Sequence, residues 1–189
     1  MSVLIEAKEA ILKAKNKEPG RPFLVAIDGR SGSGKSTLAK QLQKELGGNI
    51  FHMDDFFLRP EQRTKERLAE VGGNVDYERF AELINKVRQG EAVMYMAYDC
   101  KKQALGEGIA IEPQTLNIIE GSYSMHPYFG DVYELKITLD IEKEEQKKRI
   151  LQRNGEAMLK RFEEEWVPKE NAYLEKFEIY EGSHLIFRT

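Results

Sequence analysis

Short runs of apolar residues alternate with amphipathic stretches along this chain. Residues 23–27 read Phe-Leu-Val-Ala-Ile and are followed by glycines, which is typical of a strand buried on both faces of a parallel sheet. Similar runs predict strands over residues 49–53, 115–119 and 135–139, and a weaker one over residues 185–187. The pattern therefore favours one mainly parallel sheet.

Helical periodicity fills the stretches between these runs. Apolar residues recur every three or four positions from Leu4 to Ala14 and predict an amphipathic helix over residues 2–17. Further helices are predicted over residues 37–46, 77–89 and 141–153, and a long charged helix over residues 156–178, broken at Pro168. Strands that alternate with helices predict an α/β fold with a doubly wound sheet, whose ligands bind at the carboxyl ends of the strands.

Composition and charge narrow the class of protein. The 189 residues, 41% of them apolar, can enclose one sizeable core. A net charge of −3 provides no basic field for a nucleic acid or an anionic membrane surface, so neither is an expected partner. The single cysteine, Cys100, forms no intramolecular disulfide, and charges at Glu6, Lys8 and Glu9 interrupt the apolar N-terminal stretch. We expect a cytoplasmic protein.

A phosphate-binding loop is predicted directly after the first strand. Residues 29–37 read GRSGSGKST and match the G-x-x-x-x-G-K-[ST] pattern in its required context, between a strand and a helix. In such a loop Lys35 lies against the β- and γ-phosphates of ATP, and Ser36 offers its hydroxyl to Mg²⁺. The alternative is a glycine turn without a ligand, and a chance match is expected in roughly one chain in a hundred. The predicted nucleotide-binding residues are Gly29, Ser31, Gly32, Ser33, Gly34, Lys35, Ser36 and Thr37.

Acidic residues follow two other predicted strands. Asp54 and Asp55 end the second strand, at the sheet edge where the loop also lies. A carboxylate there can orient an acceptor hydroxyl and take its proton, and Asp54 is the catalytic candidate. The alternative is that the pair caps the next helical turn. Glu120 ends the third strand and is a candidate Mg²⁺ ligand, with a solvated strand-end acid as the alternative.

Two arginines lie one helical turn apart before a predicted helix break. Arg149 and Arg153 share one face of their helix, and Asn154-Gly155 follow. They can reach over bound phosphates as part of a mobile flap, although a basic run on a helix is usually a solvated face.

Five segments, taken together, resemble the uridine kinase and nicotinamide riboside kinase group of P-loop kinases. They are GRSGSGKST at 29–37, HMDDFF at 52–57, GGNVDY at 72–77, the pair Tyr98-Asp99, and IIEGSYS at 118–124. The resemblance spans about residues 22–187. It implies a P-loop NTPase-type three-layer sandwich with a mainly parallel central sheet and a helical lid. The implied organisation is a single kinase domain over residues 1–189, with an N-terminal helix at 1–20, an acceptor-binding insertion at 72–112 and a lid at 149–170.

The resemblance also implies roles for individual residues. Asp54 is the base near the acceptor hydroxyl and, with Glu120 and Ser36, surrounds Mg²⁺. Asp76, with Tyr77 beside it, holds the two ribose hydroxyls, for which its two carboxylate oxygens are suited. Without the family, Asp76 is interpreted as a plain helix N-cap.

The same family places further residues around acceptor and donor. Tyr98 lines the acceptor-base pocket, whereas the family's base-reading histidine corresponds to Gln103 here. Arg149 and Arg153 correspond to lid arginines that close over the donor phosphates. The resemblance therefore predicts a nucleoside or riboside acceptor without fixing the base.

The sequence as a whole predicts an ATP- and Mg²⁺-dependent kinase of a small molecule that carries a hydroxyl group. One alternative is a kinase of another hydroxyl metabolite, such as pantothenate, glycerate or a sugar, because the acceptor pocket is the variable part of the superfamily. A nucleotide-dependent switch is a second alternative, but no glutamine-bearing switch segment is found in the sequence. A homo-oligomer is left open.

Overall fold

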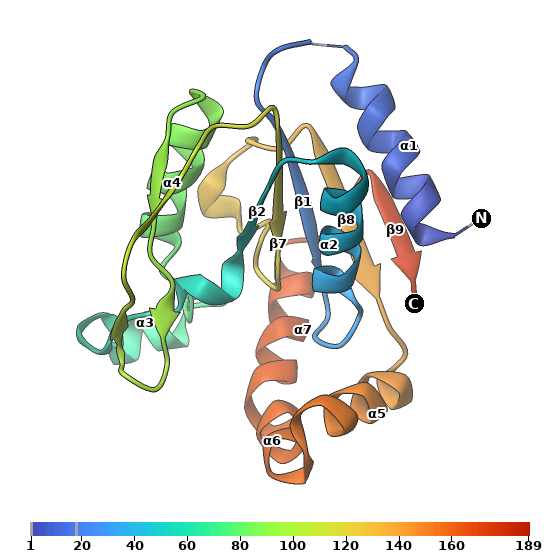
Figure 1. Cartoon of the computed structure of the whole chain (residues 1–189). Helices are drawn as coiled ribbons and strands as arrows, with labels where there is room; N and C mark the ends of the chain where they lie inside the picture. Colours follow the sequence, from blue (N-terminus) through green and yellow to red (C-terminus); the bar gives the residue numbers. More distant parts are fainter. Residues whose placement is uncertain (1, 18) are drawn as a thin grey trace.

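The computed structural model describes residues 2–17 and 19–189, so the predicted N-terminal segment 1–20 is described apart from Met1 and Glu18. A five-stranded sheet with the strand order β2-β7-β1-β8-β9 lies at its centre, and all neighbouring pairs are parallel (Figure 1). Its strands are β1 Phe23–Gly29, β2 Asn49–His52, β7 Leu116–Glu120, β8 Leu135–Asp140 and β9 Leu185–Arg188. Each predicted strand is confirmed to within two residues at either end.

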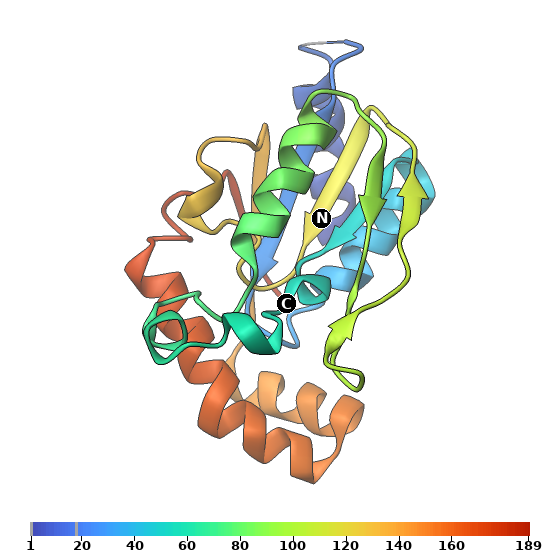
Figure 2. The ribbon, with the colours of Figure 1, turned by 90° about the vertical axis from the view of Figure 1, so that its left-hand side faces the viewer.

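Helices cover both faces of the sheet because its central strand is apolar on both sides. Every residue of β1 is buried. Val25 and Ile27 pack with helices α1 (Val3–Lys15) and α2 (Lys35–Leu46), whereas Leu24 and Ala26 pack with the layer of α4 (Tyr77–Arg88). Figure 2 shows α4 in front of the sheet and the two blue helices behind it. The predicted three-layer α/β sandwich is confirmed.

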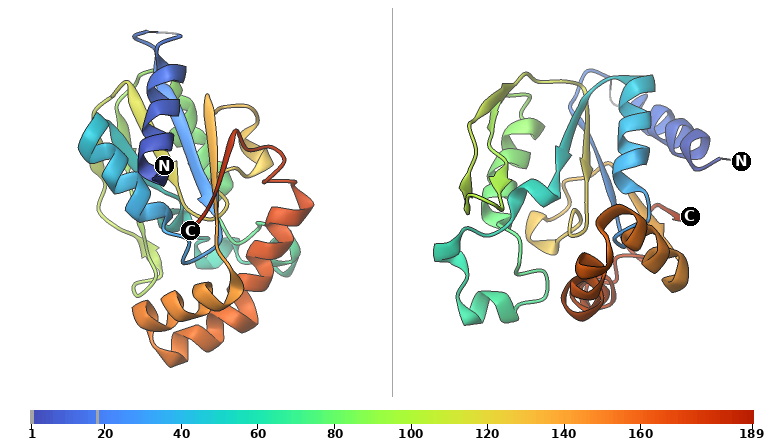
Figure 3. Two further views of the ribbon diagram at one scale, coloured as in Figure 1. Left: turned by 90° about the vertical axis from the view of Figure 1, so that its right-hand side faces the viewer. Right: turned by 60° about the horizontal axis from the view of Figure 1, so that its bottom comes forward.

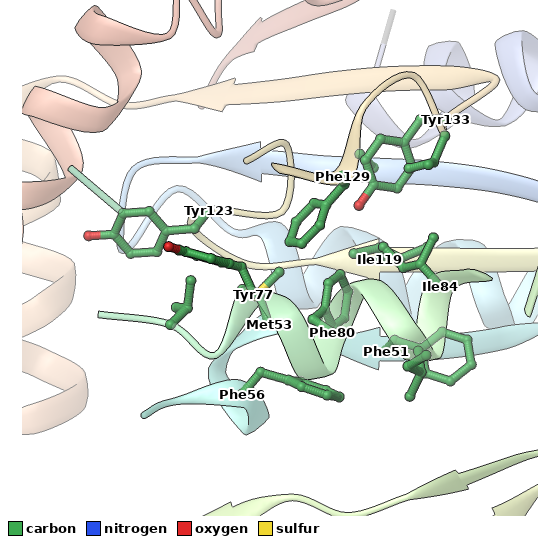
Figure 4. Packing of buried hydrophobic residues seen from close by; sticks show 14 of the residues in the cluster. Phe51, Met53, Phe56, Tyr77, Phe80, Ile84, Ile119, Tyr123, Phe129 and Tyr133 are labelled. Atoms are coloured by element: carbon green, nitrogen blue, oxygen red, sulfur yellow. The ribbon is translucent and has the colours of Figure 1, made fainter. Parts of the chain in front are cut away.

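The layer around α4 is held by aromatic residues from several elements. Phe56, from the 3-10 turn η1 (Met53–Phe56), lies 4.8 Å from Phe80 of α4 between ring centroids. Phe80 in turn lies 5.1 Å from Phe129, in the 3-10 turn η3 (Pro127–Phe129) (Figure 4). The segments that follow β2 and β7 are thereby fixed against one helix.

Small elements extend the molecule beside β2. They comprise the 3-10 turn η2 (Pro60–Gln62), the helix α3 (Lys65–Ala69) and two antiparallel ribbons. One ribbon pairs β3 (Val93–Tyr95) with β6 (Ile109–Ile111), and the other pairs β4 (Tyr98–Asp99) with β5 (Ala104–Leu105). The ribbons lie within the predicted insertion at 72–112, whose role remains a prediction.

A helical arm, residues 143–176, lies at one end of the sheet (Figure 1, Figure 3). It consists of α5 (Lys143–Asn154), α6 (Glu156–Arg161), a π-helical stretch (Phe162–Trp166) and α7 (Val167–Lys176). The predicted break at Asn154-Gly155 is present, with Gly155 at a φ of +79°. The predicted break at Pro168 is wrong: this proline lies in the first turn of α7, where no backbone N–H is needed, and Trp166 and Val167 keep helical backbone angles.

The described part of the chain, residues 2–17 and 19–189, holds no helix that is both long and apolar enough to cross a membrane.

Candidate active site

The phosphate loop joins β1 to α2, and its glycines meet steric requirements. Gly29 has a φ of +127°, and a Cβ atom there would lie 2.0 Å from the carbonyl oxygen of Leu139 on the neighbouring strand. Gly34 has a φ of +94° and stands at the N-cap of α2. Glycine tolerates these backbone angles at no cost in steric strain, so the loop can follow its tight path into the helix.

Lys35 folds back over its own loop. Its Nζ atom donates to the carbonyl oxygens of Gly29 at 2.8 Å and Arg30 at 2.9 Å. A third contact joins Nζ to Oγ of Ser122 at 3.4 Å. Neutral oxygens thus hold the ammonium group at the phosphate loop.

Ser36 and Glu120 form a pair of hard oxygen donors beside this lysine. The Ser36 hydroxyl donates to Oε2 of Glu120 at 3.0 Å. The other carboxylate oxygen of Glu120 lies 2.5 Å from Nδ1 of His52, its register partner on β2. This hydrogen bond is the main reason that the pKa of His52 is raised.

The oxygens present suit Mg²⁺ only in part. Among residues 2–17 and 19–189, no group of three or more His, Cys, Asp or Glu side chains is arranged to hold a metal ion alone. Mg²⁺ usually keeps several waters and binds through one or two carboxylates plus substrate phosphates. The Glu120 carboxylate and the Ser36 hydroxyl can therefore supply part of such a Mg²⁺ site, with waters and nucleotide phosphates as the remaining ligands.

The two aspartates after β2 have different surroundings. Asp54 is exposed, yet neighbouring protein atoms limit its hydration and thereby raise its pKa; Lys35 opposes the shift and Glu120 adds to it. The carboxylate of Asp55 accepts a hydrogen bond of 2.5 Å from the hydroxyl of Tyr95. The backbone oxygen of Asp55 accepts a further bond from Arg79. Asp55 therefore supports the fold, and Asp54 is the member of the pair that is open to a ligand.

Asp76 caps α4. Its Oδ1 atom accepts a bond of 3.2 Å from the backbone N–H of Arg79, which is the N-cap arrangement. Its Oδ2 atom lies 3.4 Å from Nε of Arg79 and 3.8 Å from Nε of Arg59. Among the described residues, Oδ2 has no hydrogen-bond partner. The N-cap interpretation thus accounts for one carboxylate oxygen and leaves the other unbonded.

Tyr77 is packed into the fold. Its hydroxyl donates to Glu70 at 2.8 Å, and the Arg67 guanidinium lies 3.5 Å from its ring centroid. Its ring stacks on His126 with centroids 4.8 Å apart. Burial raises the pKa of Tyr77 to about 12. In this structure the residue holds neighbouring side chains rather than facing an open site.

Tyr98 and Gln103 are brought together by an arginine that the sequence does not single out. Arg63 donates to the Tyr98 hydroxyl at 2.8 Å and to the side-chain oxygen of Gln103 at 2.9 Å. It also donates to the backbone oxygen of Leu58. The two positions compared with the family's base pocket therefore do lie side by side.

The two arginines of α5 point to different places. Arg149 donates to the backbone oxygen of Gly32 at 3.3 Å, so it reaches the phosphate loop. Arg153 donates to the side chain of Asn154 at 2.7 Å and lies over the ring of Phe162. Of the two, Arg149 is the one that contacts the loop here, and the reach of both arginines over bound phosphates stays a prediction.

Helix α7 is tied to β1 and the phosphate loop by three side chains, and the sequence does not single out two of them, Glu170 and Asn171. The contacts join Glu170 to Ser31, Asn171 to Arg30, and Tyr173 to Asp28. Burial raises the pKa of Asp28 to about 6, against the lowering effect of hydrogen bonds from Met125, Tyr173 and Gly29. Glu170 belongs to a strongly charged stretch of the sequence, which is typical of a solvent-exposed helix face. The sequence therefore does not indicate that this residue is buried.

The loop, the parallel sheet and the helical arm define the fold of the P-loop kinases. A crystal structure described as a candidate fructose transport system kinase from Silicibacter sp. TM1040 has this fold, at 22% identity and a TM-score of 0.75, over 99% of this chain and 100% of that chain. The family model named Zeta toxin matches residues 8–115, more than half of the sequence. The chain belongs to that family.

Curated uridine kinases are also similar, as the sequence resemblance predicts. Uridine kinase-like protein 3 of Arabidopsis thaliana is 24% identical over 151 residues, which cover 75% of this chain and 32% of that protein. The uridine kinase of Staphylococcus haemolyticus is 28% identical over 126 residues, covering 62% and 61% respectively. The chain spans less than two thirds of the length of these relatives.

Proposed function

We propose that this protein is a small-molecule kinase that transfers the γ-phosphoryl group of ATP to a hydroxyl group. The observation that carries the proposal is the meeting of Lys35, Ser36, Asp54 and Glu120 at the carboxyl edge of one parallel sheet. Such an edge is where open α/β sheets bind ligands. The names of the curated relatives support the same class of reaction.

The donor half of the site is the phosphate loop. Its backbone N–H groups would cradle the phosphates, in a loop made of Gly29, Ser31, Gly32, Ser33, Gly34, Lys35, Ser36 and Thr37. Lys35 would leave its carbonyl partners for the β- and γ-phosphates, and Arg149, already at Gly32, would add a second positive charge. Arg153 would need a movement of the arm, within the proposed lid at 149–170, to join it.

Ser36, Glu120 and Asp54 are the residues that would hold Mg²⁺. When bound, the ion neutralises charge on the phosphates. The chain's own contribution is the pair of Ser36 and Glu120 oxygens, which would hold the ion beside the phosphate loop.

Asp54 would act as the general base that takes the proton of the acceptor hydroxyl. The acceptor oxygen forms a bond to the γ-phosphorus, the bond from that phosphorus to the β,γ-bridging oxygen breaks, and ADP leaves. The hydroxyl proton would pass to the carboxylate of Asp54, the member of the aspartate pair that is open to a ligand.

The acceptor is most simply a nucleoside or riboside held by the segment 72–112. The Oδ2 atom of Asp76, which has no hydrogen-bond partner within residues 2–17 and 19–189, would accept a bond from a ribose hydroxyl. Tyr77 would lie beside it, and Tyr98 would border the base. These residues would belong, with the N-terminal helix and the lid, to one kinase domain over residues 1–189.

A kinase of another hydroxyl metabolite, such as a sugar, is the second candidate. It is favoured by the full-length fold likeness to the Silicibacter protein and by the Arg63–Gln103 contact in place of a base-reading histidine. A nucleotide-dependent switch is less well supported, because no glutamine-bearing switch segment is found in the sequence.

The test is ADP release against a panel of nucleosides, ribosides, sugars and other hydroxyl compounds, with Asp54→Asn as the blank. The proposal predicts release that depends on one class of acceptor. ADP release that never depended on any acceptor would instead favour the switch.

A further inference from the structure

Glu170 places a negative charge inside the phosphate loop. Its side chain comes from α7, and the residue is only 5% exposed. Oε2 accepts a hydrogen bond of 3.0 Å from the backbone N–H of Ser31, and Oε1 accepts one from the Ser31 hydroxyl. Oε1 also accepts a bond of 3.0 Å from the hydroxyl of Ser122. Figure 1 shows α7 next to the loop that joins β1 to α2.

The donors that hold Glu170 are of the kind that phosphate-binding loops direct at phosphates. Backbone N–H groups in such loops bind phosphate oxygens, and a carboxylate oxygen is an acceptor of the same charge type. Ser122 bonds Glu170 and also lies 3.4 Å from Nζ of Lys35. Because the lysine of this motif reaches the β- and γ-phosphates, Glu170 lies at that end of the loop.

Electrostatic repulsion makes the position of the Glu170 carboxylate at the Ser31 N–H unfavourable once a nucleotide phosphate is present. Within residues 2–17 and 19–189, Glu170 forms no ion pair within 4 Å and is held by hydrogen bonds alone. Its charge, with that of Glu120, also acts on Asp54, and Lys35 is the cation that opposes them there. A nucleotide phosphate at the Ser31 N–H would meet the carboxylate directly, and two anions cannot share one buried donor.

We propose that Glu170 occupies a phosphate position of the loop and is displaced when the β- and γ-phosphates of a nucleotide bind. Competition between this carboxylate and the phosphates then sets the nucleotide affinity. The inference rests on the proposed function, since it requires that the loop binds a nucleotide.

Displacement does not require α7 to leave the loop. Asn171 contacts the guanidinium of Arg30, and Tyr173 donates to Asp28 at 2.7 Å. Neither contact uses the Ser31 N–H. The Glu170 carboxylate can therefore leave the Ser31 N–H without breaking the other two contacts, which anchor the helix.

Glu170→Gln is the decisive variant because it keeps an oxygen for the Ser31 N–H and removes the charge. ATP, ADP and AMP are titrated by calorimetry into the wild type and the variant, with Mg²⁺ and with a chelator. We expect the dissociation constants of ATP and ADP to fall roughly ten-fold or more in both media, and that of AMP, which lacks the β- and γ-phosphates, to stay within about two-fold. The control is Glu175→Gln, an exposed acid on the same helix, which should match the wild type.

Equal or weaker binding of ATP by Glu170→Gln would overturn the inference while leaving the proposed function intact. Glu170→Ala provides a second test by the same titration. Tighter ATP binding supports competition, whereas weaker ATP binding by a variant that is still folded shows that the residue only positions Ser31. If neither the wild type nor any variant bound a nucleotide, the inference and the proposed function would both fail.

Discussion

The hydroxyl of Ser36 lies 3.0 Å from Oε2 of Glu120 and joins the first turn of α2 to the end of β7. The two residues are 84 positions apart in the chain. Parallel pairing of β7 with β1 fixes their distance, because the phosphate loop leaves β1 at the same edge. The oxygens proposed to bind Mg²⁺ are therefore positioned by the sheet itself.

Replacing Glu120 should act on the metal requirement. Glu120→Gln keeps the shape of the side chain and an oxygen for the Ser36 hydroxyl, but it removes the charge. We expect the Mg²⁺ concentration for half-maximal activity to rise roughly ten-fold or more. Activity is measured against free Mg²⁺ at saturating ATP. An unchanged Mg²⁺ dependence would remove Glu120 from the metal site.

Lys35 should matter for both binding and rate. Lys35→Met removes the charge proposed to face the β- and γ-phosphates, so the ATP affinity should fall roughly ten-fold and the turnover about 10² to 10³-fold. The control is Lys40→Met, an exposed lysine of the same helix, which should change neither. If the two variants behaved alike, the loop would have no special role.

The neighbouring aspartates should separate chemistry from stability. Asp54→Asn should lower the single-turnover rate by about 10³-fold while ATP still binds, because the base is lost. Asp55→Asn should lower the free energy of unfolding by about 1 kcal/mol, because the bond from Tyr95 is weakened. Rates come from rapid quench and stabilities from urea titration. The reverse pattern would show that the roles are exchanged.

His126 should make the fold sensitive to acid. Burial and then Arg67 lower the pKa of His126 to about 4, against the raising effect of Glu70, Glu78 and a hydrogen bond with Val71. Between pH 6.5 and about pH 4 the unfolded chain binds a proton that the folded chain does not, so stability falls as the pH falls.

The comparison for this prediction is His126→Gln with His184→Gln, an exposed histidine, as its control. The free energy of unfolding of His126→Gln should fall less on acidification than that of the wild type, and the control should follow the wild type. A parallel loss in all three proteins would mean that His126 does not contribute.

The sequence predicts those parts of the fold that depend on local patterns. The five strands and the phosphate loop follow from apolar runs and glycine spacing, and all of them are present. Glu170 could not be predicted in the same way, because its burial depends on contact with Ser31, 139 positions away. The contact of Arg63 could not be predicted for a similar reason, since Tyr98 lies on a ribbon 35 positions further along the chain.

A local sequence pattern also cannot decide the role of a residue when the same pattern is compatible with both a structural and a ligand-binding role. Asp76 satisfies the N-cap pattern of α4, and the structure shows that bond. Among the residues that the structure describes, the other oxygen of this carboxylate has no hydrogen-bond partner, which the pattern cannot reveal. Pro168 shows the converse, since a proline in the first turn of a helix does not break it.

The most direct test of the proposed function is to follow the γ-phosphoryl group itself. ATP labelled with a heavy oxygen isotope in the γ-phosphate is incubated with the protein, Mg²⁺ and the acceptor that promotes ADP release, and the products are analysed by mass spectrometry. The labelled phosphoryl group should appear on the acceptor in equal amount to ADP, and with Asp54→Asn this product should form about 10³-fold more slowly. Label found only in free inorganic phosphate, with the acceptor unmodified, would contradict the assignment as a kinase.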